Sequence, residues 1–311
     1  MQPQDAVGEY LYECRHISPD TRRWYQQKLQ LFLAWCQSEG LSDMEAIKPK
    51  DVLRFLDYLR AGVSTQSGQP RSSYTIHGYA QVLKSFFTWC GKDDLISERT
   101  RRRIEDLDMP RVEITLIQTF SKEQIHALFA ACDHEHSPAL AERDKAILAV
   151  LLDTGIRARE LCSLTLDHTM LDPQDPHLVV FGKGRKQRAV GPLGAKTRKL
   201  LRRYITSFRL AAGGVETTFV SHGGIHSGQP MTPDGLDQLL YRLRDWAEID
   251  GVRCSAHTFR HTYACNFMEQ GGDIFKLSRL LGHTNVAVTH NYLRAFNQKA
   301  ARDGQSVLDG L

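Results

Sequence analysis

Three short segments of the chain carry side chains that could act on a phosphate group. In TGIRARELCSLT, Arg157 follows the expected end of a helix, where its guanidinium could point into a cleft. In AHTFRHTYACNF, His257 and Arg260 are one helical turn apart and therefore share a face. In LGHTNVAVTHNY, His283 precedes Tyr292 by nine residues. Together these side chains indicate chemistry on an anionic group.

Arginine suits a phosphate because its guanidinium stays charged and donates two hydrogen bonds in a fork that matches two oxygens. Attack on a phosphodiester builds negative charge on the non-bridging oxygens. Fixed cationic donors stabilise that charge more in the transition state than in the ground state. Arg157 and Arg260 fit this role, and replacing either with Ala should cost at least about 2.7 to 4 kcal/mol of transition-state stabilisation.

Two other interpretations concern the same segments. Tyr292, taken alone on an amphipathic helix with Phe296, is typical of a core tyrosine. His257 and His261, four residues apart, could suggest zinc. However, the H-E-x-x-H pattern requires Glu after the first His, and Thr258 occupies that position. We therefore expect no metal site.

In combination, the segments resemble the tyrosine recombinase (phage integrase) family. The family pattern is T-G-x-R-x-x-E-L, a lysine in a β hairpin, H-x-x-R, L-G-H, and a tyrosine nine residues later. The resemblance covers residues 121–295. It extends more loosely to SPDTRRWYQQKLQLFLAWC and SSYTIHGYAQVLKSFFTWC, which look like the first and third helices of the family's core-binding domain. The matching residues are Thr154, Gly155, Arg157, Glu160, Leu161, Lys183, His257, Arg260, Leu281, Gly282, His283 and Tyr292.

The resemblance implies a site-specific recombinase that cuts and rejoins DNA through a 3'-phosphotyrosyl intermediate and a Holliday junction. Tyr292 would attack phosphorus and release a 5'-hydroxyl, and the linkage would keep the bond energy, so neither ATP nor a metal or other cofactor is needed. A tyrosine with a pKa of about 10 needs help to lose its proton. The resemblance assigns His257 as proton acceptor or phosphate ligand, Lys183 as donor to the leaving oxygen, and His283 as donor to a non-bridging oxygen.

The partners implied by the resemblance are double-stranded recombination sites and further copies of the chain. A tetramer would form on DNA, and the carboxy-terminal tail LRAFNQKAARDGQSVLDGL would pack into a neighbouring subunit. A frayed terminus is the alternative for this tail. The family also suggests DNA contacts at Thr75 and Lys84. Lys186 and Arg188 are further candidates, because the hairpin must approach DNA if Lys183 acts there.

Two alternative functions remain compatible with these motifs. A type IB topoisomerase shares the chemistry but relaxes supercoils without pairing sites, and the helical first domain and the tail argue against it. A catalytically silent DNA-binding protein is the other, and the full set of six catalytic residues argues against that. The motifs do not distinguish movement of a mobile element or cassette from resolution of chromosome dimers.

The elements expected to position these residues are mostly helices. Ser18 caps one helix and Gly40 ends it, and Ser121 with Gln124 forms a capping box for another. LVVF, GKGRKQ and RAVGP read as strand, turn and strand between Leu178 and Pro192. In the first part of the chain, helices are predicted at 18–40, after Pro49, before Gly91 and at 97–107. In the second part, one helix begins at Ser121 and another at Lys196, and further helices are predicted at 142–153, 232–247, 258–270, 274–281 and 287–295.

The 311 residues suffice for two domains. Because DMPRVEITLIQTF has no helical period and contains Pro110, we expect a linker at 108–119 between a helical core-binding domain, 1–107, and a catalytic domain, 120–311. The expected class is mainly α with a small β-sheet: an all-α SAM-like domain, as the resemblance implies, and an α+β catalytic domain.

Composition agrees with a folded DNA-binding protein. Hydrophobic residues make up 41% and charged residues 24%, as in ordinary globular proteins. The first 115 residues hold 16 basic and 16 acidic residues, so the net charge of +4 lies in the rest of the chain. No apolar stretch has the length of a membrane span, and the start of the chain lacks the pattern of a signal peptide. The seven scattered cysteines suggest thiols in the core. We therefore expect a cytoplasmic protein that is associated with the nucleoid when it binds DNA. Two basic runs could bind phosphates: Arg99, Arg101, Arg102 and Arg103, and Lys183, Arg185, Lys186 and Arg188. For the first run, a solvated helix face explains the charges equally well.

Overall fold

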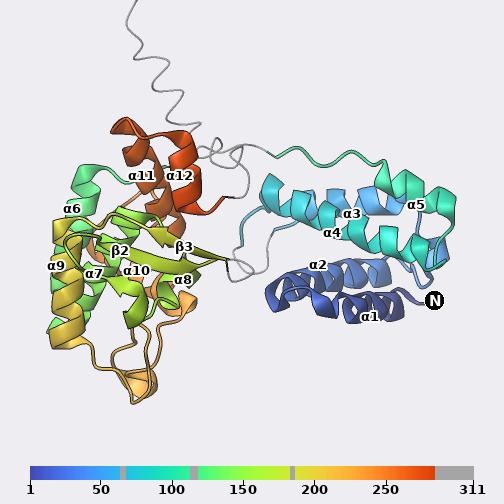
Figure 1. The fold of residues 1–311 in the computed structure, drawn as a ribbon. Helices are drawn as coiled ribbons and strands as arrows, with labels where there is room; N and C mark the ends of the chain where they lie inside the picture. The colour runs from blue at the N-terminus through green and yellow to red at the C-terminus, as the bar shows by residue number, and fades with distance from the viewer. Residues whose placement is uncertain (64–67, 113–117, 183–185, 284–311) are drawn as a thin grey trace, which may run out of the picture. The chain divides into compact units, whose positions relative to one another are not determined.

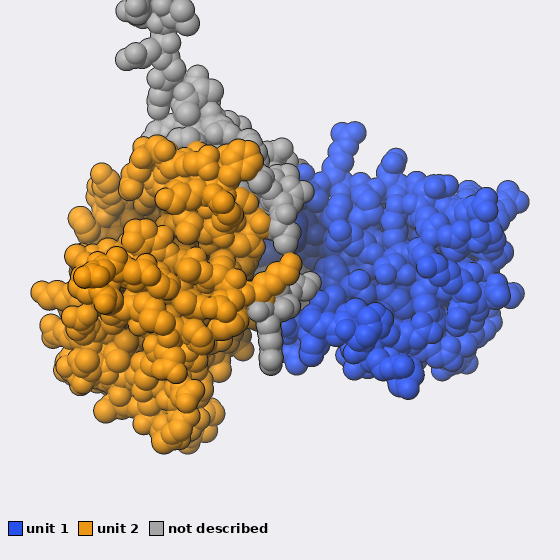
Figure 2. Space-filling view, viewed as in Figure 1, with its two compact units in different colours: residues 1–115 blue, residues 116–311 orange. Residues whose placement is uncertain are grey.

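The computed structural model describes residues 1–63, 68–112, 118–182 and 186–283, and the chain divides into two compact units (Figures 1 and 2). Unit 1 comprises residues 1–115 and unit 2 comprises residues 116–311. The division falls inside the range predicted as linker. In the described ranges, no helix combines the length and the apolar character needed to cross a membrane.

Unit 1 is helical, and the predicted helices are confirmed. Ser18 and Ser72 cap two of them by accepting hydrogen bonds from the backbone NH groups of Thr21 and Thr75. Rings from three helices, among them Phe32, Phe55 and Phe87, are fully buried at its centre. The helices are α1 (Pro3–Glu13), α2 (Pro19–Ser38), α3 (Pro49–Ala61), α4 (Ser73–Lys92) and α5 (Glu98–Glu105).

Helix α1 is absent from the sequence predictions. It spans only 11 residues, includes a glycine, and buries a narrow stripe formed by Ala6, Val7 and Tyr10. The Tyr10 hydroxyl shares a hydrogen bond of 2.8 Å with Ser85 of α4. This helix is therefore held by packing against its neighbours rather than by a strong period of its own.

Unit 2 combines a three-stranded antiparallel sheet with helices. The strands, in the order β1-β2-β3, are β1 (Thr169–Met170), β2 (His177–Phe181) and β3 (Gln187–Val190), so the predicted hairpin is confirmed. The backbone NH of Gly182 donates to Lys186 across its turn at 2.9 Å. The helices are α6 (Lys122–Ala131), α7 (Pro138–Thr154), α8 (Ala158–Cys162), α9 (Ala195–Arg203), α10 (Pro233–Trp246), α11 (Ala256–Glu269) and α12 (Ile274–Leu281).

Helix α7 forms the centre of unit 2 and packs against α9 and α11. It begins at Pro138, one turn before the predicted start, because Ser137 caps it and Pro138 occupies its first turn. The capping box of Ser121 and Gln124 at α6 is present in both directions. All seven cysteines are buried free thiols, as predicted. The helix predicted at 287–295 lies outside the described residues.

Candidate active site

The segment that carries Arg157 begins with a left-handed turn at the end of α7. Gly155 has φ +58°, and a Cβ at this position would lie 2.6 Å from the ring of Tyr263 on α11. Only glycine fits both the backbone conformation and this close approach. The turn releases the chain into α8 and presents the Gly155 carbonyl to Arg260, whose Nη1 donates to it at 2.8 Å.

Three arginines from three different elements meet at the carboxyl end of α12. Arg188 of β3 donates from Nε to the Leu280 carbonyl at 3.1 Å. The carbonyls of Leu281 and Gly282 accept from Nη2 of Arg260 at 2.5 Å and from Nη2 of Arg157 at 3.4 Å. The last carbonyls of a helix lack partners within the helix and carry partial negative charge, which explains why cations gather there.

Glu160 of α8 is the carboxylate that faces these arginines. It is 3% exposed, and each of its oxygens accepts a hydrogen bond of 2.7 Å from the Arg188 guanidinium. The backbone NH and Nη1 of Arg157 donate to it at 2.8 and 3.0 Å. Burial raises the pKa of Glu160, but the hydrogen bonds from Arg188 and Arg157, with their charges, outweigh burial and leave this pKa below its ordinary value.

His283 follows α12 directly and completes this cluster. Gly282 ends the helix in a left-handed conformation, φ +65°, which brings the imidazole Nε2 to 2.9 Å from Nη2 of Arg260. Burial, together with the charges of Arg260, Arg157 and Arg188, lowers the pKa of His283 to about 4. The ring is therefore neutral near pH 7.

His257 and His261 of α11 form a second part of the site. Their Nε2 atoms lie 3.1 Å apart and their rings are nearly perpendicular, so one ring donates its proton to the other. His261 is 3% exposed. Burial and the charges of His257 and Arg260 lower its pKa to about 3, and partial desolvation with the charges of Arg260 and Arg253 lowers the pKa of His257. In the described ranges, no group of three or more His, Cys, Asp or Glu side chains is placed to hold a metal ion.

The cluster at the end of α12 is electrostatically unbalanced. Arg157, Arg188 and Arg260 bring three positive charges, and Glu160 supplies one negative charge. Their further contacts described above are to backbone carbonyls, which carry dipoles and no net charge, and to the imidazole of His283. Counted over these four described side chains, the positive charges exceed the negative by two, which suits an anionic group such as a phosphate.

Four of the six predicted catalytic residues belong to these clusters: Arg157, His257, Arg260 and His283. Lys183 and Tyr292 lie outside the described residues. The backbone next to Lys183 nevertheless lies beside the arginine cluster, because a Cβ at Gly182 would be 3.8 Å from Nη1 of Arg188.

The predicted DNA-contact residues have varied surroundings. Lys186 is exposed, whereas the hydroxyl of Thr75 shares a hydrogen bond of 3.0 Å with the capping residue Ser72. Lys84 directs its ammonium to the carbonyls of Glu105 and Leu107. The DNA contacts of these residues stay predictions.

Arg188 differs most from its prediction. We expected it to bind a DNA phosphate, but its guanidinium, 14% exposed, is directed inward to Glu160 and Leu280. Sequence reasoning missed this role because the ion-pair partner is 28 residues away and nothing in the local pattern links the two. The phosphate contact of Arg188, like those of the other three residues, stays a prediction.

Comparison with known proteins agrees with this geometry. The Phage integrase family matches residues 118–299, and its N-terminal SAM-like domain matches residues 8–73. Tyrosine recombinase XerD of Pseudomonas aeruginosa is 31% identical over 290 residues, which cover 93% of this chain and 91% of that protein. Tyrosine recombinase XerC of Anoxybacillus flavithermus is 28% identical over 286 residues, which cover 91% and 90%.

Solved structures share the fold. The post-cleavage complex of XerH recombinase with a palindromic difH substrate has a TM-score of 0.72 at 18% identity and covers 95% of this chain and 83% of that one. A lambda integrase dimer bound to a COC' core site has a TM-score of 0.70 at 17% identity and covers 94% and 95%. Neither a topoisomerase nor a silent DNA-binding protein is favoured by these matches. On the family match and the relationship to XerD, the chain belongs to the phage integrase family of tyrosine recombinases.

Proposed function

We propose that this tyrosine recombinase holds the scissile phosphate of a double-stranded DNA site against the cluster at the end of α12. Arg157 and Arg260 would donate to the non-bridging oxygens, where charge grows in the transition state. The neutral imidazole of His283 would add a third donor, provided that the nitrogen facing the phosphate carries the proton. The convergence of Arg157, Arg260 and His283 at the end of α12 is the observation that supports this proposal most directly.

The nucleophile in this proposal is Tyr292, which forms a 3'-phosphotyrosyl bond while a DNA 5'-hydroxyl leaves. His257 would accept the tyrosine proton or bind the phosphate, and Lys183 would protonate the leaving oxygen. The proximity of Gly182 to Arg188 supports this part for Lys183, because it brings the adjoining backbone beside the arginines. Rejoining reverses the steps, so no metal or ATP enters.

Complete recombination would join four copies of the chain on two DNA sites and pass through a Holliday junction. The carboxy-terminal tail after Tyr292 would pack into a neighbouring subunit and couple its activity to that of the next. The names of the Xer relatives support the reaction class, and the assembly is our extension of it. The enzyme would act in the cytoplasm, associated with the nucleoid when on DNA.

A nicked suicide substrate tests the nucleophile. DNA flanking the gene supplies candidate sites, and cleavage beside a nick releases a short fragment that cannot be rejoined. Wild type should then appear as a covalent protein–DNA band on a denaturing gel, and Tyr292→Phe should give none. Tyr12→Phe, which changes an exposed tyrosine of α1, should trap as much DNA as wild type. Trapping by Tyr292→Phe would refute the assignment.

A further inference from the structure

Helix α9 is a concentrated source of positive charge outside the candidate active site. It contains five cationic side chains and no acidic one within Ala195–Arg203. This surplus exceeds the net charge of +4 of the whole chain. The cations are Lys196, Arg198, Lys199, Arg202 and Arg203.

The arrangement of these charges opposes the stability of the helix. Arg198 and Arg202, and likewise Lys199 and Arg203, are like charges four residues apart, which repel on a helix surface. Lys196 lies in the first turn, where the helix dipole favours acidic residues. A helix that only had to be soluble could alternate charges at no such cost, so a binding role is the better explanation.

Few of these cations are neutralised by their neighbours. Arg203 lies 3.1 Å from Glu142, and Arg202 donates to the Leu171 carbonyl at 3.1 Å. Within the described ranges, Arg198 and Lys199 form no ion pair, and the buried Nε of Arg198 has no hydrogen-bond acceptor. An added anion could pair with Lys199 and with the terminal nitrogens of Arg198.

Helix α5 of unit 1 provides a contrast. There Arg101 is bonded to Glu98 and Glu105, and Arg102 is bonded to Glu98. Two cations of that run are therefore balanced within their own helix. On α9 such internal balance is impossible, because the helix has no carboxylate.

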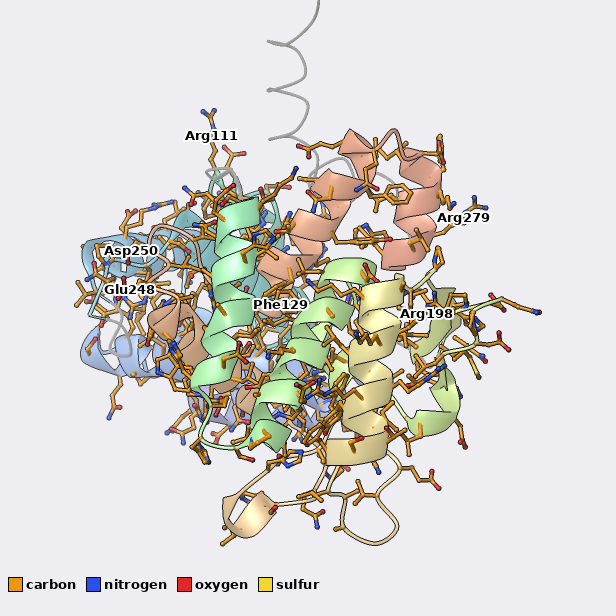
Figure 3. All side chains as sticks on the ribbon, turned by 90° about the vertical axis from the view of Figure 1, so that its left-hand side faces the viewer. Arg111, Phe129, Arg198, Glu248, Asp250 and Arg279 are labelled. Carbon is orange, nitrogen blue, oxygen red and sulfur yellow. The ribbon has the colours of Figure 1, made fainter. Side chains whose placement is uncertain are left out.

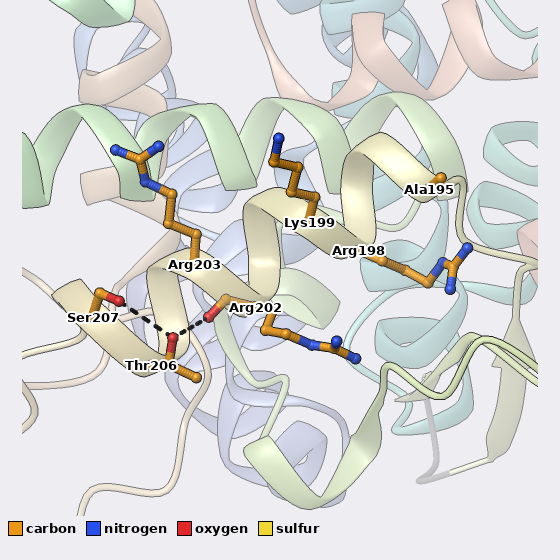
Figure 4. Close-up of a pocket in the computed structure, with 7 residues that line it drawn as sticks. All are labelled: Ala195, Arg198, Lys199, Arg202, Arg203, Thr206 and Ser207. Atoms are coloured by element: carbon orange, nitrogen blue, oxygen red, sulfur yellow. Dashed lines mark hydrogen bonds between the residues drawn. The ribbon is translucent and has the colours of Figure 1, made fainter.

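Four of the α9 cations, Arg198, Lys199, Arg202 and Arg203, line a hollow of about 440 Å³ (Figure 4). Arg198 and Arg202 extend to one side of the helix, and Lys199 and Arg203 extend to the other. The hydroxyls of Thr206 and Ser207, also shown in Figure 4, continue the polar surface past the end of α9. The charge is thus spread along the helix instead of converging on one point, which fits an extended polyanion better than a small ion.

We propose that α9 binds the phosphate backbone of a second DNA segment, separate from the one at the active site. From Lys196 to Arg203 the helix advances about 10 Å at 1.5 Å per residue. This length matches roughly three phosphates of one strand, which follow at about 3.4 Å along the duplex axis. Backbone contacts of this kind are independent of sequence.

The location of α9 separates it from the catalytic residues. Helix α9 packs on α7, whereas the arginine cluster is formed by β3, α8, α11 and α12. In Figure 1, α9 lies at the edge of unit 2 away from the end of β2, and Figure 3 shows it on a face with α6 and α7. The second segment is therefore either flanking DNA that bends back to α9 or another duplex. The inference depends on the proposed function only in taking DNA as the substrate.

Binding measurements on two duplexes test the inference. One duplex covers the recombination site alone, and the other extends it by about two helical turns at each end. The variant Lys199→Gln/Arg202→Gln removes two exposed cations of α9. The control Lys145→Gln/Arg244→Gln removes two cations of unit 2 that already pair with Asp133 and Asp245.

Wild type should bind the longer duplex more tightly, and the α9 variant should lose this gain. Two lost phosphate contacts should reduce the slope of log K against log salt by about 1.8, equivalent to about tenfold in affinity over a fourfold rise in salt. The control should behave as wild type. All three proteins should trap the short suicide substrate equally, and failure of wild type to do so would count against the proposed function, not against α9.

Two further binding measurements identify the source of the DNA. A gain that appears when the flanks are supplied as a separate duplex would indicate a second DNA molecule, and a gain that requires attached flanks would indicate bent DNA. Equal affinity and salt slope of wild type and the α9 variant on the longer duplex would overturn the inference. If the variant kept its DNA affinity but lost binding to anionic vesicles, a lipid surface would replace DNA as the partner.

Discussion

Replacing Arg188 tests whether the arginine cluster is held together as the structure indicates. Arg188→Ala removes the guanidinium that binds both oxygens of Glu160 at 2.7 Å and the Leu280 carbonyl at 3.1 Å. Glu160, 3% exposed, then keeps Arg157 as its remaining ion-pair partner among the described residues. The variant therefore leaves a buried carboxylate with two of these four hydrogen bonds, only one of them from a charged group.

The expected loss of stability is large for a single substitution. Removing one partner of a buried ion pair typically costs about 3 to 5 kcal/mol, because the other charge stays buried. Since Arg157 still donates to Glu160, we expect the lower end, about 3 kcal/mol. Arg188→Lys should fall between wild type and Ala, because lysine keeps the charge but cannot bind two oxygens with a planar fork.

Urea unfolding of the full chain, with hydrogen exchange of the α12 amides to follow unit 2, measures the effect. Arg244→Ala is the control, because Arg244 is more exposed and pairs with a largely exposed Asp245, so its loss should change stability little. The double variant Arg188→Met/Glu160→Gln should lose less stability than the sum of the losses of Arg188→Met and Glu160→Gln, by about 0.5 to 3 kcal/mol. Additive losses, or an Arg188→Ala loss no larger than that of Arg244→Ala, would refute the reasoning.

The same variants distinguish the structural role of Arg188 from the phosphate contact predicted from sequence. A phosphate contact would weaken DNA binding and lower the salt slope by about one, without changing stability. The structure instead predicts reduced stability and slower covalent trapping, with a salt slope like that of wild type.

Three further predictions concern neighbouring residues. Arg157→Lys should slow covalent trapping by about 100-fold or more, measured in single turnover, because lysine cannot donate a fork to the phosphate; an unchanged rate would exclude Arg157 from oxyanion binding. Gly155→Ala should destabilise unit 2 by about 1 to 3 kcal/mol in urea unfolding, since it combines a positive φ with a clash against Tyr263, and a neutral effect would contradict this. Burial and neighbouring charges lower the pKa of His261 to about 3 and that of His283 to about 4 in the folded chain, against about 6.5 in the unfolded chain. The unfolded state therefore binds more protons at low pH, and stability should fall as the pH drops from 6.5 to 4. The thermal midpoint of His261→Gln should fall less over this range, and a profile identical to that of wild type would argue against a buried neutral His261.

Local signals in the sequence predicted most elements of the fold. Serines at helix starts, prolines in first turns and glycines at helix ends have physical effects within a few residues, so Ser18, Ser121 and Gly155 could be interpreted without knowledge of the rest. Helix α1 was not predicted because its buried stripe is too short to produce a clear helical period in the sequence. Its stability depends on α2 and α4, which no local pattern reveals.

The candidate site was predictable in its residue types but not in its support. The order of Arg157, His257, Arg260 and His283 indicated a shared phosphate, and the structure brings Arg157, Arg260 and His283 together. The pairing of Arg188 with Glu160 depends on the register of β3, which local sequence does not determine. The sequence instead suggested a DNA contact for Arg188, because the hairpin must approach DNA if Lys183 acts there, and that contact stays a prediction.

The L-G-H motif acquires a physical meaning from this arrangement. Gly282 ends α12 so that the carbonyls of residues 280–282 accept hydrogen bonds from three arginines, and a Cβ at Gly282 would lie 2.7 Å from Arg188. Carboxylates in place of these carbonyls would cancel the charge of the arginines. Carbonyl dipoles fix the guanidiniums in position and leave their charge available. A helix end is thus a better support than an acidic cluster for a site that must attract a phosphate.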